Sequence, residues 1–97
     1  MDATKVYVTV CTEITAEGQM VPCSIEWEDG RLYPIDKVLD ITQAAARRAG
    51  GQGDRYTVRI GHTVTYLFFE RSTDLTGPVI GRWFVERKSG NTDSTAP

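Results

Sequence analysis

The chain has 97 residues, of which 40% are hydrophobic and 25% are charged, and its formal net charge is −2. This composition is typical of one globular domain that folds on its own, and the length leaves no room for a second domain. The net charge, taken alone, argues against an obligate nucleic-acid binder.

The sequence also lacks the usual marks of a membrane or secreted protein. No stretch approaches the roughly 20 apolar residues of a membrane span. The first ten residues include Asp2 and lack a basic start followed by an apolar run, as a signal peptide would have. We therefore expect a cytoplasmic protein with no membrane partner.

The first half of the chain predicts three strands. Residues 5–14 alternate, with valines on one face and Lys5 and Tyr7 on the other, which is typical of a half-buried strand. Residues 21–28 form a second strand with an inner face made of Val21, Cys23, Ile25 and Trp27. The third run begins at Leu32, and its alternation slips at Pro34, where we expect a bulge, bend or edge position before residues 38–41 rejoin the core.

The connection between the second and third runs is the strongest local signal. Asp29-Gly30 between alternating apolar residues indicates a two-residue hairpin turn of type I′. Such a turn places Trp27 opposite Leu32 as an apolar cross-strand pair in the core.

The sequence pattern changes from the two-residue period of a strand at residues 40–50, and this segment predicts one short helix. Asp40 followed by Gln43 resembles a capping box, three alanines follow, and Gly50 is placed to end the helix with a positive φ. Residues 50–54 then form a flexible loop.

The second half predicts three more strands. Residues 55–60 alternate with Tyr56, Val58 and Ile60 inward, and a tight connection at residues 61–63 leads to residues 64–70, which are apolar on both faces as in a covered central strand. Residues 82–87 form the last strand, with Trp83 and Phe84 on opposite faces.

These elements predict a mainly β fold. We expect a small antiparallel barrel or roll of five to six strands with one short helix between strands three and four, SH3-like in preference and OB-like as the alternative. Residues 1–88 form a single small β domain, and residues 89–97, which lack apolar side chains able to offset ordering entropy, form a disordered tail.

Residues that could carry catalysis or metal binding are sparse. Alternation puts Cys11 and Cys23 on opposite faces, so both should be reduced thiols that do not meet. The single histidine, His62, falls in a tight turn, and no metal-binding or nucleophile motif is present. We expect no enzymatic activity, no cofactor and no metal.

Positive charge is concentrated in the second half. Residues 1–46 carry eight acidic and three basic side chains, whereas residues 47–88 carry eight basic and four acidic ones. Arg47, Arg48, Arg55 and Arg59 form a candidate basic patch for binding, with Tyr66 or Phe68 as a stacking surface of the kind that small barrels use on nucleic acid. The same charges also fit internal ion pairs or a solvated face.

Three stretches carry a resemblance. The runs IEWEDGRLYPIDKVLDI, AARRAGGQGDRYTVRIGHTVTYLFFE and GRWFVERK resemble a family of small uncharacterised bacterial proteins, chiefly from Gram-positive organisms, over residues 20–88. Some members are encoded beside Y-family DNA polymerases, which implies an accessory role in DNA repair. The chain departs from the family pattern by inserting residues 72–80 before the last strand.

We therefore expect a non-enzymatic binding module whose partner is a protein or single-stranded nucleic acid. The alternative is a structural or oligomeric subunit, such as a homodimer, that pairs through an exposed strand edge.

Overall fold

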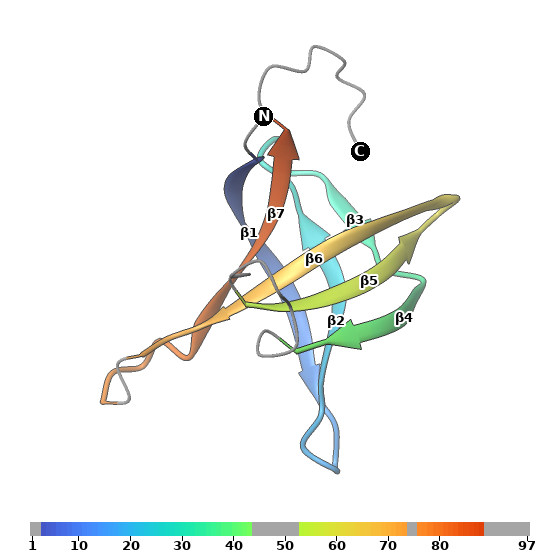
Figure 1. Ribbon diagram of the computed structural model, residues 1–97. Helices are drawn as coiled ribbons and strands as arrows, with labels where there is room; N and C mark the ends of the chain where they lie inside the picture. Colours follow the sequence, from blue (N-terminus) through green and yellow to red (C-terminus); the bar gives the residue numbers. More distant parts are fainter. Residues whose placement is uncertain (1–2, 44–52, 74–75, 89–97) are drawn as a thin grey trace.

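The structure is a computed structural model that describes residues 3–43, 53–73 and 76–88. These ranges hold seven strands and no helix (Figure 1). The strands are β1 (Ala3–Ile14), β2 (Met20–Glu26), β3 (Leu32–Pro34), β4 (Lys37–Thr42), β5 (Asp54–Ile60), β6 (Thr63–Arg71) and β7 (Gly81–Lys88). The predicted mainly β class is confirmed.

All seven strands belong to one antiparallel sheet, in the order β3-β2-β1-β7-β6-β5-β4, which curls into a half-barrel (Figure 1). The long strand β1 has two partners, because its first half pairs with β7 and its second half pairs with β2. The first and last strands therefore lie side by side in the middle of the sheet, and β3 and β4 form its edges.

The two edge strands are joined by a tight corner at Ile35 and Asp36. The Ile35 N–H donates to the Cys23 carbonyl of β2 at 2.9 Å, and the Asp36 N–H donates to the Arg59 carbonyl of β5 at 2.8 Å. The Gly61 amide also donates to the Asp36 carboxylate at 2.7 Å. The neighbouring amides of Ile35 and Asp36 thus bond to β2 and β5, which lie near opposite ends of the strand order. The two edges of the sheet therefore meet at this corner.

Because of this corner, the described residues form seven strands and not the predicted five or six. Pro34 ends β3 because proline has no N–H to donate to a ladder, and the chain then crosses to the other edge as β4. The predicted helix begins too early, since Asp40, Ile41 and Thr42 belong to β4. Gln43, the other residue of the predicted capping box, lies in no helix either. Residues 44–50 of that helix, Gly50 included, and the predicted tail at residues 89–97 lie outside the described residues.

The core lies on the inner, concave face of the sheet. Trp83 is at its centre, with ring centroids 5.1 Å from Tyr56 and 4.9 Å from Phe69. The buried members are Ile25, Tyr56, Val58, Leu67, Phe69 and Trp83. The predicted alternation of β5 and β7 is confirmed, because Tyr56, Val58 and Trp83 all face this core.

The inner face of β2 differs from the prediction. Cys11 pairs with Ser24 and Thr12 pairs with Pro22, so Cys23 is an extra residue in a β-bulge. The bulge shifts the alternation by one position. Pro22, rather than Val21, is buried together with Ile25, and Cys23 is half-buried.

The β2–β3 hairpin also has a different register from the predicted one. The Gly30 N–H donates to the Trp27 carbonyl at 2.9 Å, the Trp27 N–H donates to the Arg31 carbonyl at 2.8 Å, and only Gly30 has positive φ in this loop. This is a three-residue loop that ends on a left-handed glycine, not a type I′ turn. Leu32 consequently pairs with Glu26 and is 65% exposed, so the predicted core pair of Trp27 and Leu32 is wrong.

Two glycines with nearly the same positive φ give a matched test of packing. Gly18 (φ 87°) has open space around it, whereas a Cβ on Gly53 (φ 83°) would lie 2.5 Å from the Phe69 carbonyl oxygen. We expect Gly18→Ala to lower the free energy of unfolding by about 1–2 kcal/mol, the cost of a left-handed residue. Gly53→Ala should lose about 1–3 kcal/mol more from overpacking, measured by urea denaturation. Equal losses for the two variants would contradict this packing of β5 on β6.

Candidate functional site

A row of four aromatic side chains crosses the convex outer face of β1, β7 and β6. Register pairs Tyr7 with Phe84 and Phe84 with Phe68, so the three rings point to the same side of the sheet. Ring centroids are 5.8 Å apart for Tyr7 and Phe84, and 5.0 Å apart for the stacked rings of Phe84 and Phe68. Tyr66 extends the row, with its centroid 6.5 Å from that of Phe68.

The members of this aromatic row differ in exposure. Phe84 and Phe68 are 0% and 3% exposed, although they lie on the face of the sheet opposite the cluster around Trp83. Tyr7 and Tyr66 are 41% and 48% exposed. The two phenylalanines therefore form a packed base, and the two tyrosines at its ends are accessible to a partner.

Three cationic side chains lie over the faces of these rings. The Lys5 Nζ is 4.8 Å from the Phe84 centroid. The guanidinium carbon of Arg55 is 4.5 Å from the Tyr66 centroid, and that of Arg82 is 3.9 Å from the Tyr7 centroid. At exposed sites such cation–π contacts contribute about 0.5–1 kcal/mol each. The face thus combines aromatic surface with positive charge at Phe84, Tyr66 and Tyr7.

Arg55 has a further property. Its Nε atom is buried and has no hydrogen-bond acceptor among the described residues. A buried donor without an acceptor costs about 1–3 kcal/mol, so such groups in native proteins call for an explanation. A partner that binds at this end of the aromatic row and offers an acceptor atom would satisfy the Arg55 Nε–H group.

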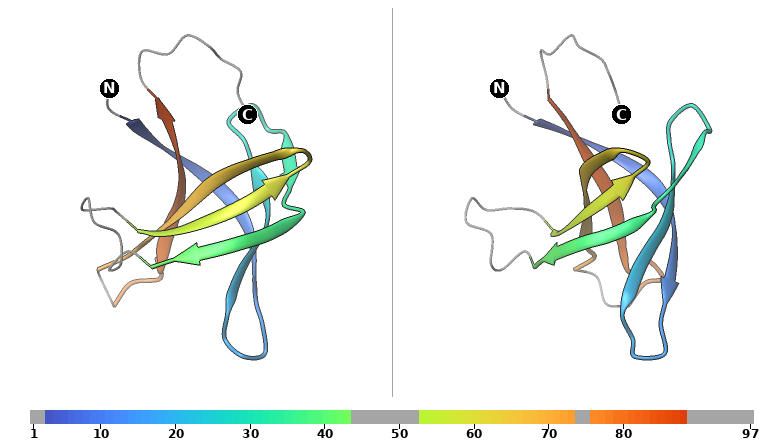
Figure 2. Two further views of the ribbon diagram at one scale, coloured as in Figure 1. Left: turned by 45° about the vertical axis from the view of Figure 1, so that its right-hand side comes forward. Right: turned by 90° about the vertical axis from the view of Figure 1, so that its right-hand side faces the viewer.

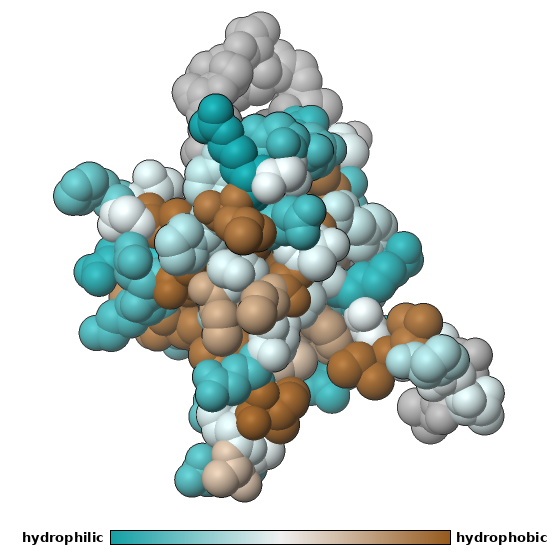
Figure 3. All heavy atoms as spheres, turned by 180° about the vertical axis from the view of Figure 1, so that it is seen from behind, coloured by the Kyte–Doolittle hydropathy of each residue, from teal (hydrophilic) through white to brown (hydrophobic). Residues whose placement is uncertain are grey.

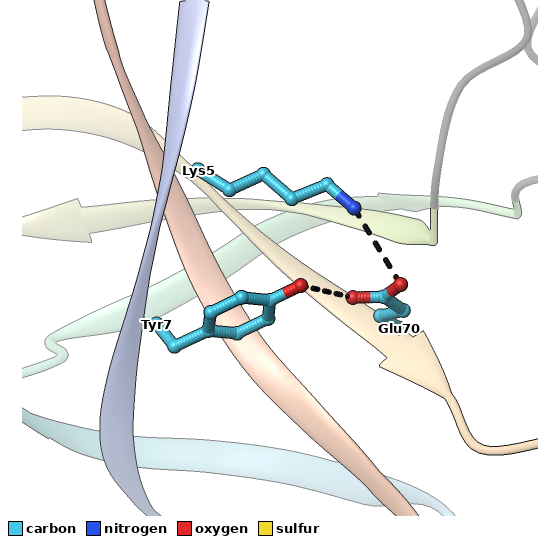
Figure 4. A network of polar contacts seen from close by, with 3 residues as sticks. All are labelled: Lys5, Tyr7 and Glu70. Carbon is cyan, nitrogen blue, oxygen red and sulfur yellow. Dashed lines mark hydrogen bonds and ion pairs between the residues drawn. The ribbon is translucent and has the colours of Figure 1, made fainter.

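Glu70 holds one end of the row in place (Figure 4). The Tyr7 hydroxyl donates to Glu70 Oε1 at 2.8 Å, and the Lys5 Nζ is 3.5 Å from Oε2. The hydrogen bond from Tyr7, followed by the charge of Lys5, holds the pKa of the Glu70 carboxyl below its ordinary value. Glu70 is therefore ionised at neutral pH and orients Tyr7 and Lys5.

Two of the four arginines of the predicted basic patch lie in the described residues. Arg55 and Arg59 lie on the same face of β5, as predicted, and Arg59 pairs in register with Lys37 of β4. Arg47 and Arg48 lie outside the described residues. Across β1, β4, β5, β6 and β7, the charged side chains on this face are five cations, Lys5, Lys37, Arg55, Arg59 and Arg82, and four acids, Glu13, Asp40, Glu70 and Glu86.

Sequence reasoning missed half of this face. Lys5 and Tyr7 were expected to point outward, and Phe84 to point away from Trp83, so the signal was present in the alternation. The missing information was the pairing of β1 with β7, which places Tyr7 beside Phe84.

A second polar group lies at one mouth of the half-barrel. Asp54 is buried, and the Arg71 guanidinium donates to its carboxylate at 3.2 Å. Burial, reinforced by the Asp54 charge, raises the pKa of the Tyr56 hydroxyl. This pair neutralises a carboxylate at the core's edge and has the ordinary properties of a structural ion pair.

The other reactive residues are dispersed. Cys11 is exposed, Cys23 is half-buried, and both are free thiols. His62 is exposed in the β5–β6 turn. Within residues 3–43, 53–73 and 76–88, no three side chains of His, Cys, Asp or Glu come together as a metal site, and no helix there is long and apolar enough to cross a membrane.

Comparison of the chain with protein-family models, curated proteins and solved structures gave no match. The resemblance to small bacterial proteins therefore stays a prediction.

The lowered pKa of Glu70 predicts a pH dependence of stability. Its folded-state pKa lies below its unfolded-state value, so its contribution is complete above the unfolded value and is lost as the pH falls through the folded one. We expect the difference in unfolding free energy between the wild type and Glu70→Gln to shrink between about pH 6 and pH 3. When Glu70→Gln is introduced into the Tyr7→Phe variant, it should change the free energy of unfolding at neutral pH by less than it does in the wild type. A difference that is constant with pH would contradict this network.

Proposed function

We propose that the outer face of β1, β7, β6 and β5 binds single-stranded nucleic acid. The observation that carries this proposal is the aromatic row with Lys5, Arg55 and Arg82 placed over its rings. Proteins that bind single strands combine aromatic platforms for the bases with cations along the backbone. A sheet face that offers both at contact distance meets these two requirements.

The energetics favour exchange of the cations for bases. A cation–π contact at an exposed ring is worth about 0.5–1 kcal/mol, whereas stacking of a base on an aromatic side chain is worth about 1–3 kcal/mol. Arg55 and Arg82 can therefore swing from the tyrosine faces to phosphate oxygens as bases stack on Tyr66 and Tyr7. The acceptor that Arg55 Nε lacks would then be a phosphate oxygen.

The charge of the face limits the affinity. Four cations, Lys5, Arg55, Arg59 and Arg82, lie along β1, β5 and β7 within reach of one strand, and the whole chain is weakly acidic. For single strands the logarithm of the affinity falls by about 0.7 per phosphate contact for each decade of salt, so a slope of about −2 to −3 is expected. Binding should be moderate and favoured at low salt.

The strand order supports an SH3-like roll over an OB-like barrel. Every ladder joins sequence neighbours, apart from the pairing of β1 with β7, and all are antiparallel. An OB fold is a Greek-key barrel, which needs a non-sequential connection. A cytoplasmic role as a non-enzymatic accessory to bacterial DNA repair, which the sequence resemblance implies, is part of this proposal and would supply single-stranded DNA as the partner.

Fluorescence anisotropy with a fluorescein-labelled oligothymidylate of about 20 nucleotides tests the proposal, since one small barrel covers about 4–16 nucleotides. We expect binding at low salt with the slope given above. Arg55→Gln and Arg82→Gln should each reduce the slope by about 0.7, and Tyr66→Leu should weaken binding about five-fold or more, with little change in slope.

Arg31→Gln is the matched control, because Arg31 is an exposed arginine in the β2–β3 turn, away from the aromatic row. It should bind as the wild type does. Absence of binding at low salt, or an equal loss for Arg31→Gln and Arg82→Gln, would refute the proposal.

A further inference from the structure

The half-barrel is open along one side, between β2 and β4. A groove of about 320 Å³ runs between these strands. It is lined by Gln19, Met20 and Val21 on one side and by Val38, Leu39, Asp40 and Ile41 on the other. We call this groove the seam. Figure 2 shows β2 and β4 diverging from the corner at residues 34–36 towards the opposite end of the barrel.

Both walls of the seam present backbone edges. Among the described strands, β4 pairs with β5 alone, and β3 covers only residues 24–26 of β2. The Cys23 carbonyl is used by Ile35, where the seam closes. The seam side of β4, and of β2 from Met20 to Pro22, therefore has no strand neighbour in the part of the chain that the structure describes.

Apolar side chains gather at the open end of the seam. A second groove of about 690 Å³ continues from it across the mouth of the half-barrel, and the two share Gln19, Met20 and Ile41 as lining residues. Five exposed large apolar residues stand along these two grooves, namely Ile14, Leu39, Ile41, Val79 and Ile80. Figure 3 shows apolar side chains on the two loops that project at this end, and clustered exposed apolar surface marks an interaction site.

The geometry decides what kind of occupant fits. A helix satisfies its own backbone groups, so it would leave the edge of β4 unpaired. A second copy that paired its own β4 with this edge would bring its β5 in behind, into the position where β2 forms the far wall of the seam. One extended chain satisfies a strand edge and places alternate side chains towards the apolar lining.

The charge of the seam adds a preference. Asp40 is the one charged residue among the described residues that line it, and its carboxylate is exposed. Two further acids, Glu13 and Glu17, lie in the adjoining β1–β2 hairpin. A basic side chain in the bound segment would complement these carboxylates.

We propose that the seam binds an extended segment of a partner protein, which adds as a strand along β4 and carries apolar residues at alternate positions and a lysine or arginine near Asp40. This site is centred on the free edge of β4 and the groove beside it, whereas Asp40 lies at the outer rim of the groove, on the same side of β4 as Arg55 and Arg59.

A library of random peptides displayed on phage, selected on the immobilised full-length chain, tests the proposal. We expect enriched sequences with apolar residues at every second position and a basic residue. A synthetic peptide of an enriched sequence should lose about ten-fold or more in affinity for Asp40→Lys, which replaces an attraction by a repulsion. Asp29→Lys, the same change in the exposed β2–β3 turn, should bind as the wild type does. N-methylation of one set of alternate peptide amides should abolish binding, because only one set faces β4 and donates to its edge, whereas N-methylation of the other set should be tolerated.

Several results would overturn the proposal. These are the absence of enriched peptides, equal binding to Asp40→Lys and Asp29→Lys, or binding that survives N-methylation of each of the two sets of alternate amides in turn. If the peptide and oligothymidylate compete for the protein, the peptide binds the outer face and not the seam. A dimer in light scattering that Asp40→Lys dissociates would assign the edge of β4 to a second copy. The N-methylated peptides keep the test valid even if a variant were unstable.

Discussion

The rest of the structure depends on two neighbouring amides. The N–H groups of Ile35 and Asp36 donate to β2 and β5, strands that lie near opposite ends of the sheet order. An open seven-stranded sheet would expose both of its faces to water. Because the corner draws its ends together, the concave face becomes a closed core around Trp83, and the Gly61 amide bonded to the Asp36 carboxylate fastens the corner to the β5–β6 turn.

Closure also explains why the domain offers two different surfaces. Curling the sheet turns β1, β7 and β6 outward with a second aromatic layer, in which the buried Phe84 and Phe68 lie between the more exposed Tyr7 and Tyr66. The same curl is incomplete, because β3 is only three residues long and ends at a proline. The seam is the consequence, since β2 continues beyond the reach of β3 and faces β4 across a groove. Both proposed binding sites, the outer face and the seam, therefore follow from one structural constraint.

Local patterns predicted local geometry. The shared face of Arg55 and Arg59 follows from the two-residue period of a strand, which is independent of what the strand pairs with. Leu32 was misplaced because Asp-Gly fits both a two-residue turn and a three-residue loop that ends on glycine, and one residue of slip reverses the face. The proximity of Lys5 and Arg82 to the aromatic row depends on the pairing of β1 with β7, a contact between distant parts of the chain that no local period encodes.

Amide hydrogen exchange followed by NMR tests the closure of the half-barrel most directly. The Ile35 and Asp36 amides belong to no regular ladder, so in an open sheet they would exchange with water at the rate of an unfolded loop. Closure predicts that both are protected to the same degree as the amide of Val58 in the buried strand β5, because each is released only when an edge detaches. Rapid exchange of both amides, with Val58 still protected, would contradict the closed corner and with it the origin of both surfaces.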